Sequence, residues 1–421
     1  MKVLLTGGSG FIAAHVVERL LSRGYEIVTT VRSPAKGSFI TSKYPSARIS
    51  IAIVEDISQP SSFDDVIKKH SPLDAVIHTA SPFHYNVQDN EKDLLNPAIM
   101  GTTSVLRALK QYGGDSVKRV VITSSFAAMT NPANPPDVYN EDAWNPMTWE
   151  DAVTTKNPQV AYRGSKKFAE TAAWDFIEKE QPLPFTLTVL NPPFVFGPIL
   201  HELKSLDSIN TSNKRALNII QGKKHEGPIG SSLYVDVRDL AEAHVRAVEP
   251  KYAAAQGKRI FMTAGPFTDL YVAERIREKF PSIRERITDD LLQNLGEKSA
   301  PMKFEVDNSR SKEVLGMEYR STEETITDTV QSLLDHAKAK PKVQTLAATS
   351  RTTTRDQDHQ KYRQDQSTAN GQSHKEALLV SILLPFIVPW RARKFRVVPV
   401  EWATTDHHTG LWNEFRVFQW M

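Results

Sequence analysis

Residues 2–24, KVLLTGGSGFIAAHVVERLLSRG, join a short apolar run to a glycine-rich turn and an amphipathic segment. This order predicts a strand over residues 2–6, a tight turn, and a helix that runs to about residue 22. Three small residues stand three positions apart across the turn and the helix start: Gly7, Gly10 and Ala13. In a dinucleotide-binding turn, such residues permit the bend, let the backbone approach a pyrophosphate and let helix and strand pack closely. The stretch therefore predicts a nucleotide site at the N-terminus of a helix.

Strand and helix patterns then alternate along the chain. Apolar runs predict strands at residues 25–31, 48–54, 75–78 and 117–123. Helical patterns lie at 63–69 and at about 97–110. Alternation of this kind predicts an α/β fold, a Rossmann-type doubly wound parallel sheet with helices on both faces. Ligands of such sheets bind beyond the carboxyl ends of the strands.

The end of the second strand carries cations. A NAD site would place Asp or Glu there, on the ribose 2′-hydroxyl, but this chain has Arg32, and Lys36 follows. A guanidinium grips a phosphate through two parallel hydrogen bonds, so the pair favours NADP over NAD. The alternative is that both are solvated surface cations.

The third and fourth strands also end in polar residues. Asp56 and Ile57 follow the third strand, where they could hold an adenine by a hydrogen bond and apolar contact. Asp56 could equally cap the helix at 63–69. His78 ends the fourth strand without a partner at metal-ligand spacing, so we interpret it as structural and expect no metal site.

Residues that could move a proton come next. Ser124 and Ser125 end the fifth strand, where a hydroxyl could hydrogen-bond a substrate carbonyl, or merely complete backbone bonds. In AYRGSKKFAETAA, residues 161–173, Tyr162 lies four residues before Lys166 and shares a helix face with it. A neighbouring ammonium lowers the pKa of a phenol toward neutral pH. The alternative is a solvated helix face.

Composition excludes several functions. The 421 residues include no cysteine, which removes disulfides, thiolate nucleophiles and cysteine-bound metals. The net charge is only +3 and the cations are scattered, so nucleic-acid binding is not expected. The N-terminus enters a strand at once, and we predict no secretory signal and a cytoplasmic protein.

Several motifs together resemble one family. They are TGGSGFIA at 6–13, HTASPF at 78–83, ITSSFAA at 122–128, YNEDAWNP at 139–146, YRGSK at 162–166, NPPFVFGP at 191–198 and YVDVRDLAEAH at 234–244. Over about residues 1–340 the chain resembles the extended short-chain dehydrogenase/reductases. Within them it is most similar to the dihydroflavonol-reductase-like branch and to the fungal NADPH-dependent methylglyoxal and aldehyde reductases.

The resemblance implies roles for individual residues. The catalytic serine falls on Ser125, with Ser124 the neighbour it could be confused with, and Tyr162 and Lys166 take the other catalytic roles. The implied NADP contacts are Gly7, Gly8, Ser9, Gly10, Phe11, Ile12, Arg32, Lys36, Asp56, Ile57, Tyr162, Lys166, Val195 and, less directly, Ser212. Ala13 replaces a glycine found in other branches.

The expected reaction is NADPH-dependent reduction of an aldehyde or ketone. Ser125 would orient the carbonyl oxygen, Tyr162 would protonate it, and Lys166 would acidify the tyrosine and bind the nicotinamide ribose. The substrate could be a small metabolic aldehyde or a ketone of a secondary-metabolite pathway. Two alternatives are an epimerase or dehydratase on the same scaffold, and a non-catalytic NADP-sensing regulator.

The chain divides into three predicted parts. Residues 1–190 form mainly the NADP-binding domain, and residues 191–340 mainly a substrate lobe with strands that return to the sheet. Four aromatic residues near the motif loops could line an apolar slot or belong to the core: Phe83, Phe126, Phe194 and Tyr234. The protein could be a monomer or a homodimer.

Residues 341–421 form the third part, a low-complexity tail that we predict to be disordered because residues 345–375 are almost devoid of apolar side chains. Residues 377–390 are apolar but short and interrupted by proline, so they do not predict a membrane span. The basic residues at 391–396 could still attach to a membrane surface; otherwise the tail is an appended segment without function or a gene-prediction error.

Overall fold

The computed structural model describes residues 1–45, 47–81, 87–224, 232–297 and 302–338, all of them in one structural unit. The predicted tail at 341–421 and the predicted slot residue Phe83 lie outside these residues.

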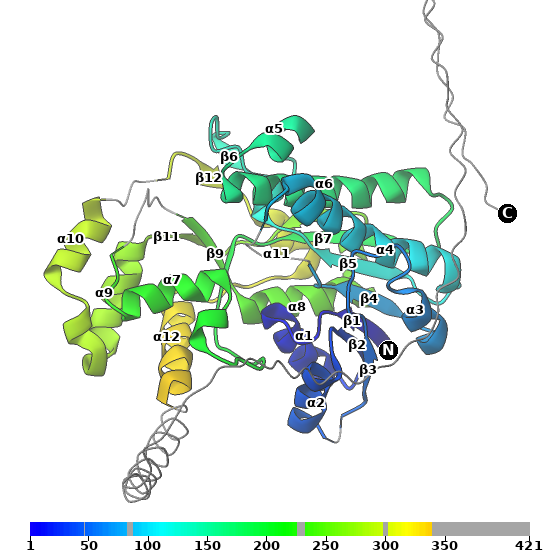
Figure 1. The fold of residues 1–421 in the computed structure, drawn as a ribbon, viewed down its shortest axis with the longest axis horizontal. Coiled ribbons are helices and arrows are strands. Elements are labelled where there is room, and N and C mark those ends of the chain that lie inside the picture. Colours follow the sequence, from blue (N-terminus) through cyan, green and yellow to red (C-terminus); the bar gives the residue numbers. More distant parts are fainter. Residues whose placement is uncertain (46, 82–86, 225–231, 298–301, 339–421) are drawn as a thin grey trace, which may run out of the picture. The chain divides into compact units, whose positions relative to one another are not determined.

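A seven-stranded parallel sheet forms the centre of the fold (Figure 1). Its strand order is β10-β7-β5-β4-β1-β2-β3. The strands are β1 Lys2–Thr6, β2 Glu26–Val31, β3 Ile49–Ile53, β4 Ala75–His78, β5 Arg119–Thr123, β7 Thr186–Asn191 and β10 Arg259–Phe261. Val3 is the Cα partner of both Ile27 and Ala75, so β1 lies between β2 and β4. The order reverses at β1 and β4, and this is the point where doubly wound sheets bind ligands.

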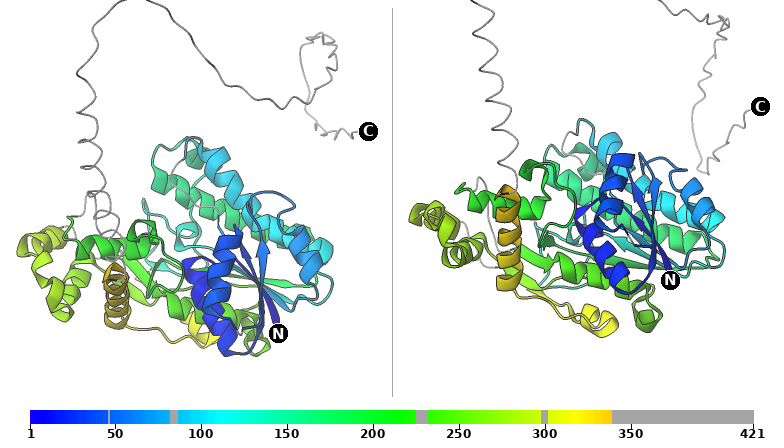
Figure 2. Two further views of the ribbon diagram at one scale, coloured as in Figure 1. Left: turned by 60° about the horizontal axis from the view of Figure 1, so that its bottom comes forward. Right: turned by 90° about the horizontal axis from the view of Figure 1, so that it is seen from below.

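Helices cover both faces of this sheet, as the two views in Figure 2 show. Val3 and Leu5 of β1 face the helices α1 Phe11–Ser22 and α8 Val237–Val248. Leu4, between them, faces the opposite layer of α3 Asp64–His70, α4 Asn96–Tyr112 and α6 Pro158–Lys179. Because successive side chains of a strand point to opposite faces, one apolar run supplies both cores.

The second half of the chain builds a smaller layer with its own core. A three-stranded sheet, in the order β11-β9-β8, consists of β8 Phe194–Phe196, β9 Ser232–Asp236 and β11 Gly265–Phe267. Four helices enclose its apolar cluster: α7 Thr211–Ile220, α9 Asp269–Lys279, α10 Asp289–Glu297 and α12 Thr322–Lys338. β6 Val138–Tyr139 and β12 Glu305–Val306 form a separate parallel pair.

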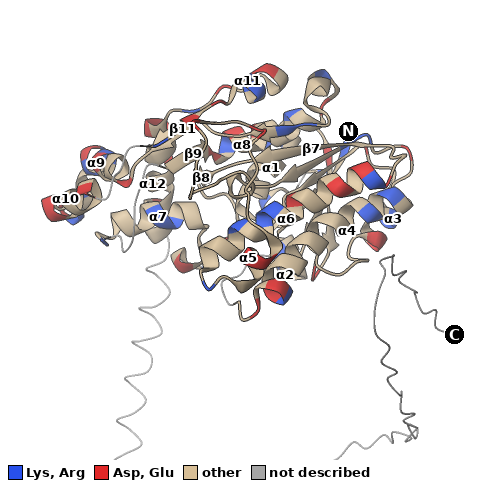
Figure 3. Ribbon diagram, turned by 90° about the horizontal axis from the view of Figure 1, so that it is seen from above, with Lys and Arg blue, Asp and Glu red and all other residues tan. Residues whose placement is uncertain are grey.

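Short elements complete the described chain. They are α2 Pro34–Lys43, α5 Trp149–Thr154, α11 Ser309–Leu315, the π-helical turn η1 Glu91–Leu95, and the short helices η2 Phe126–Ala128, η3 Leu206–Ser208, η4 Pro250–Ala255 and η5 Pro281–Arg286. Acidic and basic residues lie side by side on α3, α6 and α9 (Figure 3). No described helix combines the length and apolarity that crossing a bilayer requires.

The predicted fold class is confirmed. The first and fourth predicted strands have the predicted bounds, and the other predicted strands differ by at most two residues at either end. α2 has no counterpart among the predicted elements; its mixed composition carries little helical periodicity. The division into domains stays a prediction, although α8 and β10 from the second half do pack with the main sheet.

Candidate active site

The glycine turn between β1 and α1 is shaped by close contacts. Gly7 has a φ of +74°, a conformation that side chains other than glycine rarely adopt. A Cβ on Gly8 would lie 2.1 Å from the Thr29 Oγ1 atom, so only hydrogen fits between the turn and β2. The turn is closed by a hydrogen bond of 2.8 Å from Gly10 N to Gly7 O. These contacts bring the backbone of the turn against the ends of β2 and β4.

The N-terminus of α1 is left open for an anion. Gly10 is the N-cap and has no side chain to bond the first-turn N–H groups, and this turn contains no acidic residue. Ser9, Phe11 and Ile12 surround this end, while Ala13 is buried against the sheet. Unpaired N–H groups and the positive end of the helix dipole favour phosphate here. The turn thus fits a dinucleotide, although its contacts stay predictions.

The two predicted 2′-phosphate cations have different surroundings. Arg32 is exposed at the end of β2 and makes no salt bridge to any described residue. Lys36 on α2 instead lies 3.2 Å from the Glu202 carboxylate, which follows β8. Arg32 is therefore available to a phosphate as it stands, whereas Lys36 is already paired.

Asp56 and Ile57 lie in a turn after β3. The Asp56 carboxylate accepts bonds from the Gln59 side chain and from the side chain and backbone of Ser58, and these bonds lower the Asp56 pKa. Asp56 does not cap α3, which was the alternative interpretation, because the N-cap of α3 is Phe63. Ile57 is buried and its carbonyl accepts a bond from Ser104. The adenine contacts stay predictions.

Ser125 rather than Ser124 faces the tyrosine. The Ser125 side chain lies near enough to the Tyr162 phenol to oppose the rise in its pKa that burial causes. The Ser124 hydroxyl points into the protein, where it donates to Glu170 Oε2 at 2.5 Å. Consecutive residues at a strand end point to opposite sides, so only one of the two serines can reach the site.

Lys166 lies on the same face of α6 as Tyr162. Its Nζ atom is 5.8 Å from the centroid of the Tyr162 ring and donates a hydrogen bond of 3.0 Å to Ser81 Oγ. Ser81 follows Ala80, whose Cα would be 3.0 Å from a Cβ on Gly7. The Tyr–Lys pair is thereby joined to the glycine turn through two consecutive residues of the loop after β4.

The titration of the pair differs from the expectation. Burial raises the pKa of Tyr162, and the Ser125 side chain opposes that rise. Burial also lowers the pKa of Lys166 to about 8. The sequence predicted that Lys166 would lower the pKa of Tyr162. In the structure Lys166 instead donates its hydrogen bond to Ser81, and Ser125 is the group that lowers the Tyr162 pKa. A buried phenol keeps its proton at neutral pH, as a proton donor must.

Val195 and Ser212 contact each other. Val195 N donates to Ser212 Oγ at 2.9 Å, and both residues are buried. Ser212 thus holds the backbone of β8, and its predicted contact with the cofactor stays a prediction.

The aromatic residues proposed for a substrate slot divide between core and rim. Tyr234 is 2% exposed, and its hydroxyl donates to Arg320 O, so it belongs to the core. Phe126 stacks on Phe261 with ring centroids 5.1 Å apart, and Phe194 is half-buried. A cavity of about 560 Å³ lies beside Tyr162, lined by residues of 87–94 and of 153–162. Its volume is in the range of small-molecule sites.

Several residues of the site were not predicted from the sequence. Three of them lie in loops or at strand ends, where no periodic pattern marks them: Ser81, Asn191 and Arg259. The fourth, Glu202, follows the NPPFVFGP motif, and nothing in that motif indicates that Glu202 pairs with Lys36. Only Glu170 carried a usable signal, because it stands four residues beyond Lys166 and continues the face of Tyr162. No group of metal-ligating side chains occurs in the described ranges.

The geometry is that of a dinucleotide-dependent enzyme of the short-chain type, and comparison with known proteins identifies the class. The profile of the NAD dependent epimerase/dehydratase family matches residues 3–262, and the chain belongs to this family.

Particular relatives can also be named. The chain is 42% identical over 347 residues to the ketoreductase azaE of Aspergillus niger, covering 80% of this chain and 98% of the relative. It is 37% identical over 342 residues to the NADPH-dependent methylglyoxal reductase GRE2 of Saccharomyces cerevisiae, covering 79% and 98%. The crystal structure of yeast methylglyoxal/isovaleraldehyde reductase Gre2 complexed with NADPH superposes with a TM-score of 0.72 at 36% identity, covering 80% and 99%. The predicted family is confirmed.

Proposed function

We propose that this protein reduces an aldehyde or ketone to the alcohol with NADPH. The observation that carries the proposal is that Ser125 lies beside Tyr162, on the helix face that also presents Lys166 beside the glycine turn. The relatives support it, since they include an NADPH-dependent reductase and a ketoreductase.

The chain's own groups would bind the cofactor and handle the proton. The glycine turn and the first turn of α1 would bind the pyrophosphate, and Arg32 the 2′-phosphate. When bound, NADPH supplies the hydride. Ser125 donates a hydrogen bond to the substrate oxygen, and Tyr162 gives its hydroxyl proton to the same oxygen, so that an alcohol leaves and a tyrosinate remains to be reprotonated. Lys166, as an ammonium, stabilises that tyrosinate.

The substrate class follows from the cavity beside Tyr162. Its lining combines apolar side chains such as Val87, Leu94 and Val153 with polar ones such as Asn90 and Thr155. This mixture suits a small carbonyl compound with some polar substituents. We also propose that the protein is cytoplasmic; a chain without cysteine is compatible with a reducing compartment.

The test is a panel of aldehydes and ketones with NADPH, followed by absorbance at the reduced nicotinamide band. We expect turnover of at least one class, and loss of at least about 1,000-fold in kcat for Tyr162→Phe, since this change removes the proton donor. NADPH affinity, followed by nicotinamide fluorescence, should change less than about threefold. Retained activity in Tyr162→Phe would refute the assigned role, and tightly held nucleotide with no net consumption would favour an epimerase.

A further inference from the structure

A buried carboxylate connects the catalytic helix to three strands. Glu170 on α6 is 2% exposed. Its Oε2 atom accepts hydrogen bonds from Ser124 Oγ at 2.5 Å and from Asn191 Nδ2 at 2.7 Å, and its Oε1 atom accepts from Arg259 Nε at 2.6 Å. These partners stand at the carboxyl ends of β5 and β7 and at the start of β10, which are neighbours in the sheet.

Arg259 extends this connection to the loop that follows Ser125. Its Nη1 atom donates to the carbonyls of Glu141 and Ala143 at 2.6 and 2.9 Å, and its guanidinium lies 3.7 Å from the centroid of the Trp144 ring. The next residue, Asn145, donates from Nδ2 to Ala127 O at 3.1 Å. The YNEDAWNP motif thus bridges Glu170 and the backbone after Ser125.

We propose that Glu170 is a positioning residue for the reaction, acting on Ser125 and Lys166 without touching the substrate. The inference rests on the proposed function. Glu170 binds Ser124, which precedes Ser125, while Asn191 also donates to the Ser125 carbonyl at 3.2 Å. Glu170 therefore fixes the distance between Ser125 at the end of β5 and Tyr162 on α6. Both side chains must reach the same carbonyl oxygen of the substrate.

The charge of Glu170 also reaches Lys166 one helical turn away. Burial lowers the Lys166 pKa to about 8, and the Glu170 carboxylate opposes that decrease. Among the described residues, the other titratable groups facing Lys166 are Tyr162 on the same helix and His78 at the end of β4. His78 is neutral near pH 7, since burial lowers its pKa to about 3. Within the described part of the chain, Glu170 is therefore the anion that favours the protonated form of Lys166.

The experiment compares Glu170→Gln with Glu141→Gln. Both carboxylates are buried, and Glu141 also accepts a bond from β10, through Phe261 N at 2.9 Å, but it does not contact Ser124 or Asn191. For Glu170→Gln we expect kcat to fall by about 10- to 100-fold, while the affinity for NADPH changes less than about threefold. The alkaline limb of the pH profile of kcat/KM should move to lower pH, since Lys166 loses its proton more easily. Glu141→Gln should leave that limb in place.

A third variant covers the case in which Glu170→Gln does not fold. Ser124→Ala removes one bond to Glu170 and keeps the Glu170–Arg259 pair, so kcat should fall several-fold with the alkaline limb unmoved. If the wild type turns over substrate and both Glu170→Gln and Glu141→Gln have the same kcat and pH profile as the wild type, the inference is overturned. An unchanged kcat in Ser124→Ala would also overturn it. Absence of turnover in the wild type would instead overturn the proposed function.

Discussion

At the scale of single residues, we expect the cofactor preference to depend on Arg32 and on the ion pair that Lys36 makes. Arg32 is exposed and without a salt bridge to any described residue, while Lys36 is 3.2 Å from Glu202. Both members of the Lys36–Glu202 pair are about one-third exposed, so the pair contributes roughly 1 kcal/mol or less. A 2′-phosphate that binds Lys36 has to compete with the Glu202 carboxylate.

Two substitutions should therefore change the cofactor preference in opposite directions. Arg32→Asp places an anion against the 2′-phosphate and should lower the ratio of NADPH to NADH efficiency by about 10- to 100-fold, the value of one or two charge-assisted hydrogen bonds. Glu202→Gln frees Lys36 and should tighten NADPH binding by about two- to fivefold, with NADH binding unchanged. Steady-state kinetics with both cofactors measures the efficiency ratio, and fluorescence titration measures the change in binding. An unchanged ratio in Arg32→Asp would exclude the 2′-phosphate assignment.

At the scale of elements, the sequence predicts where a strand ends but not which of two neighbouring side chains at that end reaches the site. The apolar runs predicted the strands, and the strand ends predicted where the site lies. Whether Ser124 or Ser125 reaches it depends on which way the strand end turns, and the resemblance selected Ser125. The Glu170 cluster could not be predicted, because Arg259 is 89 residues away and meets Glu170 only through the order in which β5, β7 and β10 lie in the sheet.

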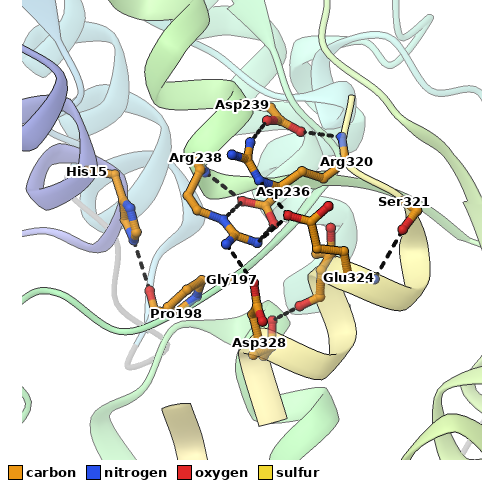
Figure 4. A network of polar contacts seen from close by, with 12 residues as sticks. His15, Gly197, Pro198, Asp236, Arg238, Asp239, Arg320, Ser321, Glu324 and Asp328 are labelled. Carbon is orange, nitrogen blue, oxygen red and sulfur yellow. Dashed lines mark hydrogen bonds and ion pairs between the residues drawn. The ribbon is translucent and has the colours of Figure 1, made fainter. Parts of the chain in front are cut away.

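An ion-pair network holds the last helix against α8 (Figure 4). Arg238 grips the Asp236 carboxylate through two bonds of 2.9 and 2.7 Å and reaches Asp328 on α12 at 2.6 Å. Asp239 accepts bonds from the backbone and the guanidinium of Arg320, just before α12. The figure shows these charges gathered between the two helices. The network thus connects the smaller layer to a helix of the main sheet.

Loss of the central arginine should destabilise the protein strongly. Arg238→Gln leaves the Asp236 side chain, which is fully buried, without a counter-charge, at a cost of about 3–5 kcal/mol. Asp328→Asn is the matched control, because the Asp328 side chain is 40% exposed and its change should cost less than about 1 kcal/mol. Urea unfolding of both variants measures the difference. Equal losses would show that the network is not centred on the buried pair.

At the scale of the whole molecule, the chain is longer than its relatives. The alignments with azaE and GRE2 cover 98% of each relative but only 80% and 79% of this chain. α12 ends at Lys338, and its apolar face closes the core of the smaller layer. About one-fifth of this chain therefore has no counterpart in these relatives, and we expect that the residues after 340 are not needed for catalysis.

A chain ending at Lys340 tests this directly. It keeps every residue of the proposed site and the whole of α12. Its kcat and KM should therefore agree with those of the full chain within about twofold, and its urea midpoint within about 0.3 M. Sedimentation with vesicles, half of them containing anionic lipid, measures the separate role that the basic residues at 391–396 would have. If the full chain binds only anionic vesicles and the shortened chain binds neither kind, the tail attaches an active enzyme to membrane surfaces. Lower kcat in the shortened chain would instead place part of the tail in the catalytic fold, because a surface anchor has no means of changing turnover in free solution.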